Sequence, residues 1–108
     1  MARYYGMVKC IDYNVGKTLD TLRRDGLIDN TIVVFTSDHG DLRGEHHRQN
    51  KGVPYEGSAR IPFVIYCKDK IKPGTVVAQA LTCVAFKPTV LALMGSRTIG
   101  MRGVMPQC

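Results

Sequence analysis

Residues 31–56 of this 108-residue chain read TIVVFTSDHGDLRGEHHRQNKGVPYE. The run opens with six apolar or β-branched residues and then changes abruptly to the polar tetrapeptide SDHG at Ser37–Gly40. All three histidines of the chain lie in residues 39–47, with carboxylates among them. Open α/β sheets bind their ligands at the C-terminal ends of strands. We therefore expect the rest of the chain to support the loop that follows this strand.

The segment before this run, residues 2–25, is predicted to be an amphipathic helix. Its apolar side chains recur at spacings of three and four, the period of one helix face. They are Tyr4, Val8, Ile11, Val15, Leu19 and Leu22. Gly26 is placed to take the left-handed conformation that ends many helices, and Leu27 can fold back on the last turn. We expect this helix to cover one face of a sheet.

Two apolar runs, residues 31–37 and 61–67, are predicted to be strands. The first shows no polar alternation, which is typical of a strand buried on both faces of a parallel sheet. A helix, a short loop and a buried strand make half of a βαβ unit, so the predicted fold class is α/β with a mainly parallel sheet. Residues 38–60, between the strands, form a long connection, and such loops are usually functional or disordered.

The C-terminal third is less regular. Residues 75–84 are ambiguous and allow a short strand. Residues 86–94 predict a helix with Pro88 in its first turn and Gly95 as its stop. Residues 96–108 show no periodicity, and we expect irregular structure there.

Length and composition bound the range of functions. A chain of 108 residues makes one small domain, and its 44% hydrophobic and 22% charged contents are ordinary for a globular protein. No apolar run reaches the length of a transmembrane helix, and residues 1–10 lack the apolar core of a signal peptide. A membrane is therefore not an expected partner, and localisation is left open.

The net charge of +6 is unevenly distributed. Residues 1–69 carry ten Lys/Arg and nine Asp/Glu, whereas residues 70–108 carry five basic residues and no acidic one. These charges are scattered, without interleaved aromatic residues or a recognition motif, so nucleic acid is not an expected partner. The four cysteines form no CxxC pair and predict free thiols rather than a zinc or disulfide framework.

Asp38 and His39 are the first candidates for chemistry. A carboxylate and an imidazole side by side at a strand end are both ligand types for a divalent cation, and Asp favours hard ions such as calcium or magnesium. An Asp-His dipeptide is also common in turns, where Asp38 would cap backbone N–H groups and His39 would be exposed.

Lys51 is the second candidate, because a lysine beside a metal can contact an anionic oxygen of a substrate. A solvated surface lysine is the commoner alternative. Glu45 and His46 are candidates for acid–base groups or outer-shell partners of the metal. His47 and Arg48 are expected to be solvated.

The pattern VVFTSDHGDLRGEH, then Lys51, then PYEGSARIPFVIY resembles the sulfatases of the alkaline phosphatase superfamily. Residues 4–31 resemble the helix that precedes this motif in the family, and KPGTVV and PTVLALMG match the segment that follows. SDHG alone is weakly specific. SDHGD, GEH, Lys51 and YEG in this order and spacing are strongly specific, and the resemblance covers residues 4–95.

The resemblance implies that residues 1–108 are one partial domain, the C-terminal portion of a catalytic domain with a three-layer fold and a mainly parallel sheet. It implies a calcium-dependent hydrolase of sulfate esters. Asp38 and His39 would be metal ligands, although many members have Asn in place of His39. Lys51 would contact the sulfate group, and His46 would lie near the active site.

Several family features are missing from the chain. The family nucleophile is a formylglycine made from the Cys or Ser of a C/S-x-P/A-x-R motif, and no cysteine here stands in that context. The N-terminal Asp-Asp metal pair and the sulfate-binding histidine before the long helix are absent, and Ala85 replaces a usual Asp. The resemblance therefore implies a sulfatase fragment, inactive alone, with the formylglycine expected in a missing N-terminal part.

Two other functions stay open. A phosphatase or phosphonate monoester hydrolase of the same superfamily also uses Asp-His metal ligands, with transition metals, although Lys51 with YEG favours a sulfatase. A non-catalytic metal-binding or interaction domain is the other alternative.

One long and one short helix are too few to cover both faces of a sheet, so we also expect self-association through exposed strands.

Overall fold

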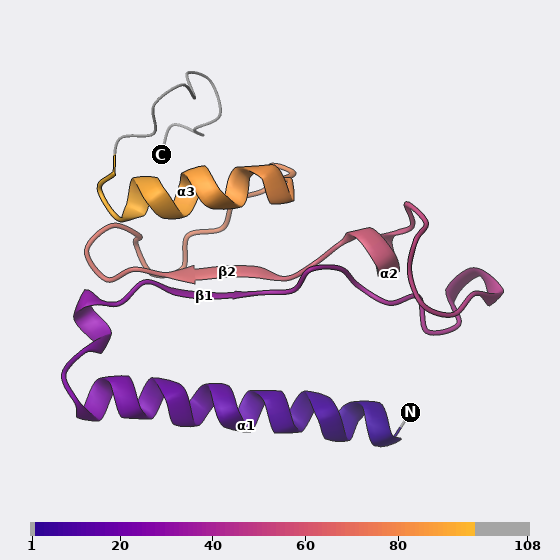
Figure 1. Ribbon diagram of the computed structural model, residues 1–108, viewed down its shortest axis with the longest axis horizontal. Coiled ribbons are helices and arrows are strands. Elements are labelled where there is room, and N and C mark those ends of the chain that lie inside the picture. Colours follow the sequence, from indigo (N-terminus) through magenta and orange to yellow (C-terminus); the bar gives the residue numbers. More distant parts are fainter. Residues whose placement is uncertain (1, 97–108) are drawn as a thin grey trace. The chain divides into compact units, whose positions relative to one another are not determined.

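The computed structural model describes residues 2–96 (Figure 1). These residues divide into two compact units. Residues 2–31 and 67–96 form one unit, and residues 32–66 form the other. The first unit holds the helices α1 (Ala2–Arg24) and α3 (Phe86–Leu93) and the 3₁₀ turns η1 (Ile28–Asn30) and η3 (Cys83–Ala85). The second holds β1 (Val33–Thr36), η2 (Glu45–His47), α2 (Glu56–Ala59) and β2 (Phe63–Tyr66).

Helix α1 confirms the amphipathic helix predicted for residues 2–25. Gly26 has a φ of +68°, the left-handed region that favours glycine. Its N–H donates to the Arg23 carbonyl at 3.1 Å, and the Leu27 N–H donates to the Leu22 carbonyl at 2.8 Å. These two bonds form the Schellman motif, so the helix ends where its glycine predicts.

The two predicted strands form and pair with each other as β1 and β2, but the pairing is antiparallel. Val33 lies opposite Tyr66 and Thr36 lies opposite Phe63. The mainly parallel sheet predicted from the sequence is therefore not what the described residues contain. A parallel pair needs a crossover that carries the chain back to the starting end of the sheet, usually a long helix. The connection here holds only short helical turns and returns from the end at which β1 finishes (Figure 1).

The prediction that the first strand is buried on both faces is also wrong for this chain. Val33 and Val34 are half-buried, whereas Phe35 and Thr36 are exposed. In β2, Val64 is 60% exposed. A strand is buried on both faces only where other elements pack on each face, so these apolar runs leave part of their surface uncovered.

The C-terminal predictions are confirmed in part. Helix α3 forms with Pro88 buried in its first turn, and Gly95 has a φ of +78° where the helix stops. Residues 75–84, all described, contain no strand. Most of the segment expected to be irregular, residues 97–108, lies outside the described residues.

Within residues 2–96, Cys10, Cys67 and Cys83 are free thiols. None of the helices in this range combines the length and apolarity needed to cross a membrane.

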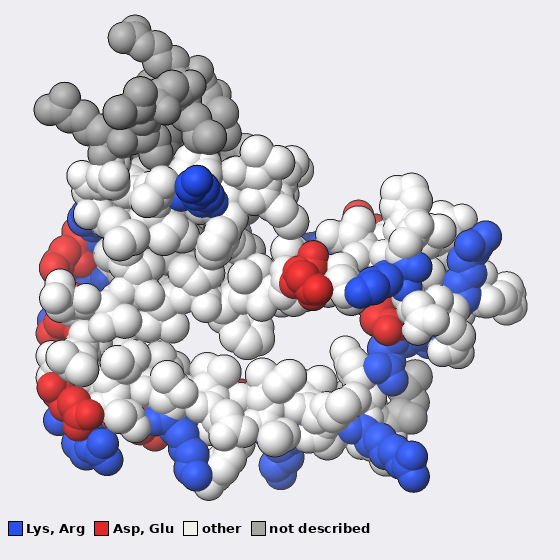
Figure 2. All heavy atoms as spheres, viewed as in Figure 1, with Lys and Arg blue, Asp and Glu red and all other residues white. Residues whose placement is uncertain are grey.

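Charged side chains are unevenly distributed over the face of the molecule shown in Figure 2. Figure 2 shows Lys and Arg along the lower edge of α1 in that view, while much of the remaining visible surface is uncharged. The basic residues of α1 are Arg3, Lys9, Lys17, Arg23 and Arg24. Among its apolar side chains, Ile11 is 54% exposed, and no residue of α1 is buried.

Candidate functional site

The loop between β1 and β2 is organised around Leu42. Its side chain is buried, at 2% exposed, and the other buried residues among 2–96 are Ser58 and Pro88. Its N–H donates to the Asn50 carbonyl at 2.8 Å, and the Gly44 N–H donates to the Arg48 carbonyl at 2.8 Å. Four non-glycine residues of the loop have positive φ, namely Arg43, His46, His47 and Asn50. Such backbone needs surrounding structure to hold it, so this loop is folded rather than extended.

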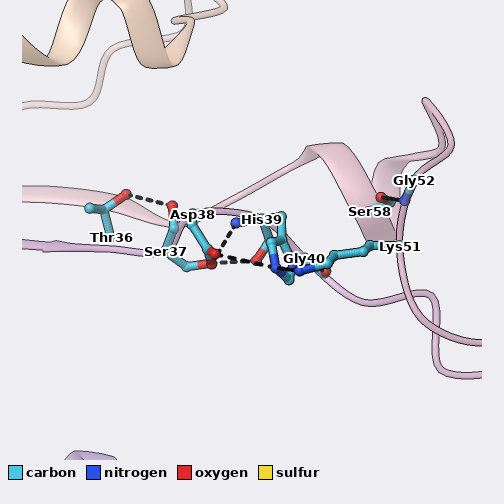
Figure 3. Close-up of polar contacts among 8 residues, drawn as sticks. All are labelled: Thr36, Ser37, Asp38, His39, Gly40, Lys51, Gly52 and Ser58. Carbon is cyan, nitrogen blue, oxygen red and sulfur yellow. Dashed lines mark hydrogen bonds and ion pairs between the residues drawn. The ribbon is translucent and has the colours of Figure 1, made fainter.

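Asp38 and His39 lie immediately beyond the C-terminal end of β1 (Figure 3). The Asp38 Oδ1 accepts a hydrogen bond from the His39 backbone N–H at 2.9 Å. This contact is the local cap that the sequence offered as an alternative to metal binding. The second carboxylate oxygen, Oδ2, lies 3.3 Å from the His39 Nε2, and the Asp38 side chain is 83% exposed. One oxygen of Asp38 is therefore used locally while the other faces the imidazole.

The imidazole of His39 is oriented by contacts on both ring nitrogens. Nδ1 lies 2.7 Å from the Gly40 carbonyl oxygen, so a proton on Nδ1 donates to that carbonyl. Nε2 then presents a lone pair, and the ammonium of Lys51 donates to it. Both contacts are satisfied by the same neutral tautomer. A backbone carbonyl on the other nitrogen is the usual way in which a metal-binding histidine is oriented.

Asp38, His39 and Lys51 thus converge although Lys51 is twelve residues from His39 (Figure 3). Two electron-rich atoms, Asp38 Oδ2 and His39 Nε2, face each other at 3.3 Å, an arrangement that a cation between them would stabilise. Calcium lies about 2.3–2.6 Å from oxygen ligands, so atoms at this separation can contact one ion. The donor set fits a divalent metal, with one oxygen and one imidazole ligand.

The rest of a metal shell is not supplied by the described part of the chain. No group of three or more His, Cys, Asp or Glu side chains suited to a metal occurs within residues 2–96. Because calcium takes about six to eight oxygen ligands, Asp38 and His39 could fill only a minority of its shell.

His46 is not brought into this group. Its ring stacks on Tyr55, with centroids 4.1 Å apart and planes inclined by 30°. Nearby, a Cβ added to Gly57 would lie 2.3 Å from the Glu45 carboxylate, so the GEH and YEG segments pack against each other. His47 and Arg48 are exposed, as expected from the sequence.

Sequence reasoning missed two residues that hold the site together, Gly40 and Ser58. A Cβ on Gly40 would lie 2.0 Å from the Gly57 carbonyl oxygen, so the backbones approach too closely for any side chain. The Gly40 N–H donates to the Ser58 carbonyl at 2.9 Å. The glycine of SDHG and the YEGS run were visible in the sequence, but their contact joins residues eighteen positions apart and has no local signal.

Most of the chain matches a known protein family. The sulfatase family model matches residues 1–96. An arylsulfatase of Clostridium perfringens is 44% identical over 93 residues, which make 83% of this chain and 19% of that protein. A solved Bacteroides fragilis protein assigned to the sulfatases is 41% identical, with a TM-score of 0.77, and the match covers 82% of this chain and 19% of that one.

A second solved structure contains its substrate, D-glucosamine-2-N,6-O-disulfate. It is 36% identical, with a TM-score of 0.80, over 86% of this chain and 19% of that chain. The described fold is therefore shared with part of these larger proteins. This chain spans about a fifth of the length of the relatives it matches.

Proposed function

Because this chain belongs to the sulfatase family, we propose that it supplies part of the catalytic centre of an enzyme that hydrolyses sulfate esters. The observation that carries the proposal is the convergence of Asp38, His39 and Lys51 at the end of β1. In this proposal residues 1–108 form the C-terminal portion of the catalytic domain. The sulfatases among its relatives support sulfate esters as the substrate class.

Asp38 and His39 are the proposed metal ligands, through Oδ2 and Nε2. The metal, which we propose to be calcium, would supply positive charge close to the anionic sulfate. The Gly40 carbonyl holds the proton of His39 on Nδ1 and so keeps the Nε2 lone pair directed at the cation.

Lys51 is the proposed catalytic contact to the sulfate group. In this structure its ammonium donates to the Nε2 lone pair that the metal would need, so with a metal bound the ammonium would leave Nε2 and could reach a sulfate oxygen beside it. Preorganised positive charge lowers the barrier when negative charge develops on an oxygen. His46, stacked on Tyr55, is proposed to act from outside the ligand set by fixing the loop.

The nucleophile is proposed to lie outside this chain, as a formylglycine in the N-terminal part of the parent enzyme. Hydrolysis needs a nucleophile as well as charge stabilisation, so we expect no sulfatase turnover from the 108-residue chain alone. Aryl-sulfate hydrolysis by the pure chain that Lys51→Ala abolishes would contradict this.

A chimaera tests the function directly. This chain would replace the matching segment of the Clostridium perfringens arylsulfatase, to which it is 44% identical. We expect turnover in the chimaera, and a loss of kcat/KM of about 10²–10³-fold in both Asp38→Ala and Lys51→Ala, the cost of removing a charge-stabilising group. Lys9→Ala, on α1, is the matched control. Full turnover in Lys51→Ala would refute the proposal.

Calcium binding by the isolated chain gives a readout that is independent of turnover. Two ligands predict weak binding, and Asp38→Ala should weaken it by at least about tenfold. Asp69→Ala removes the same charge in the other compact unit and should leave the affinity unchanged. Calorimetry that gives equal calcium affinities for the wild-type chain and Asp38→Ala would exclude Asp38 as a ligand.

The exposed strands support a further proposal about assembly, that the isolated chain associates with itself. Val64 and Phe35 present apolar surface, and a two-stranded sheet leaves two open edges. Sedimentation over a concentration series should show association that Val64→Lys weakens. A monomer at all concentrations would contradict it.

A further inference from the structure

Ser58 lies beside the site in a position that neither its local sequence nor the proposed chemistry explains. It belongs to the short helix α2 and is 7% exposed, the one buried polar residue among residues 2–96. Buried polar side chains are nearly always hydrogen-bonded, so the partners of this hydroxyl indicate what it does.

The hydroxyl of Ser58 accepts a hydrogen bond from the Gly52 backbone N–H at 3.3 Å (Figure 3). Gly52 directly follows Lys51 and has a φ of +101°, in the left-handed region that side chains disfavour. The backbone that carries Lys51 is therefore held in an unusual conformation by a bond to the Ser58 side chain.

The carbonyl of Ser58 accepts the second bond, from the Gly40 N–H at 2.9 Å. Gly40 directly follows His39, and its carbonyl is the group that receives the His39 Nδ1 proton. One residue therefore fixes the segment that carries the metal-ligand pair with its backbone and the segment that carries the lysine with its side chain.

We propose that Ser58 is a positioning residue that sets Lys51 against Asp38 and His39, through its hydrogen bonds to Gly52 and Gly40. Lys51 is twelve residues along the loop from His39, and its long side chain has many rotamers. The direction of the Lys51 backbone therefore decides where the ammonium can lie. This inference rests on the proposed function for the importance of Lys51, but its geometry can be tested separately.

The test uses NMR on the 108-residue chain with Ser58→Ala. This change removes the acceptor of the Gly52 N–H and keeps the carbonyl that binds Gly40. Hydrogen exchange at Gly52 should accelerate by roughly tenfold, the equivalent of one ordinary hydrogen bond, while Gly40 keeps its protection. The nuclear Overhauser contact between the Lys51 ε-methylene and the His39 ring should be lost. Ser58→Thr, which retains the hydroxyl, should keep it.

Ser58→Cys separates positioning from folding, since it keeps the side-chain shape, with one somewhat larger atom, and replaces the oxygen by a weaker acceptor. Selective loss of protection at Gly52 in this variant supports the inference even where the alanine variant unfolds. Equal loss at Gly40 and Gly52 in both variants would make Ser58 a purely structural residue and overturn it. So would a Lys51–His39 contact that survives in Ser58→Ala.

The chimaeric arylsulfatase distinguishes failure of this inference from failure of the proposed function. If Ser58 acts through Lys51, Ser58→Ala should lower kcat/KM alone and add nothing to Lys51→Ala, since residues that act as one unit are not additive. Additive losses would overturn the positioning role and leave the proposed function standing. Full activity in Lys51→Ala would overturn the proposed function whatever the geometry at Ser58.

Discussion

Helix α1 and the loop of residues 37–58 make a sharp contrast. The helix spans 23 residues and follows the sequence pattern closely, yet none of its residues is buried. The loop has little regular structure, yet it contains both Leu42, at 2% exposed, and Ser58, at 7% exposed. The chain therefore buries little of the regular helix α1, whereas the irregular loop buries side chains of its own.

The contrast shows that local regularity and tertiary packing are separate properties. A helix satisfies its backbone internally, so α1 can form although its apolar stripe is at most half-buried. A loop cannot do so, and its backbone groups must find partners across the chain. In this chain the loop finds them, as in the bonds from Leu42 to Asn50 and from Gly40 to Ser58. Substitutions should therefore cost more in the loop than on the helix.

Leu42→Ala should have the largest effect. It empties a site at 2% exposed, and such truncations lower stability by about 2–5 kcal/mol. Hydrogen exchange at Leu42 and Gly44, whose amides donate within the loop, measures the free energy of opening. The control is Leu27→Ala, the same change just beyond α1, where the side chain is 54% exposed. Equal effects of the two would break the contrast.

Gly40→Ala should come next, with Gly57→Ala as its control. The new Cβ at Gly40 would lie 2.0 Å from a backbone carbonyl oxygen, so the loop must shift, and overpacking of this kind costs about 1–3 kcal/mol. At Gly57 the nearest atom belongs to the flexible carboxylate of Glu45, which can move away. Thermal unfolding followed by NMR should show a large loss for the first and little for the second. A neutral Gly40→Ala would mean that the close approach is not required.

His46→Ala and Tyr55→Ala should have a smaller effect and should be coupled to each other. Their rings are stacked at 4.1 Å, and aromatic pairs contribute about 0.5–1.5 kcal/mol beyond their buried area. Both side chains are exposed, so the lower end of this range is expected. A double-mutant cycle measures the coupling, with Tyr5→Ala on α1 as a change at another exposed aromatic. A coupling energy of zero would mean that the stacked pair of His46 and Tyr55 does not stabilise the loop.

Asp20→Asn on α1 should have the smallest effect. It breaks the ion pair with Arg23, whose atoms lie 2.9 Å apart at an exposed i,i+3 position. Such pairs contribute about 0.2–0.5 kcal/mol and are screened by salt. Far-UV circular dichroism should show a slight loss of helix at low salt and none at high salt. Asp12→Asn removes the same charge without touching the pair. A loss as large as that of Leu42→Ala would reverse the contrast.

The features that the sequence predicts correctly depend on residues close together in the chain, and those that it misses depend on distant contacts. The boundaries of α1 and α3 follow from apolar spacing, Pro88 and the glycines at 26 and 95, all of which act within a few residues. The direction of strand pairing does not, because an apolar run carries no information about the neighbour beside it. The expected parallel sheet therefore gave way to an antiparallel pair whose partners are far apart in sequence.

For the candidate site, the family and the residue types could be read from the sequence, since SDHG, Lys51 and YEG are visible at fixed spacing. Three contacts could be seen only in the tertiary structure. Lys51 meets His39, and His46 stacks on Tyr55. Ser58 joins the two segments of the loop through its hydrogen bonds. Each of these depends on how a long loop closes. Loop closure is set by bonds between distant backbone groups, such as Gly40 to Ser58, which no local pattern of side chains encodes.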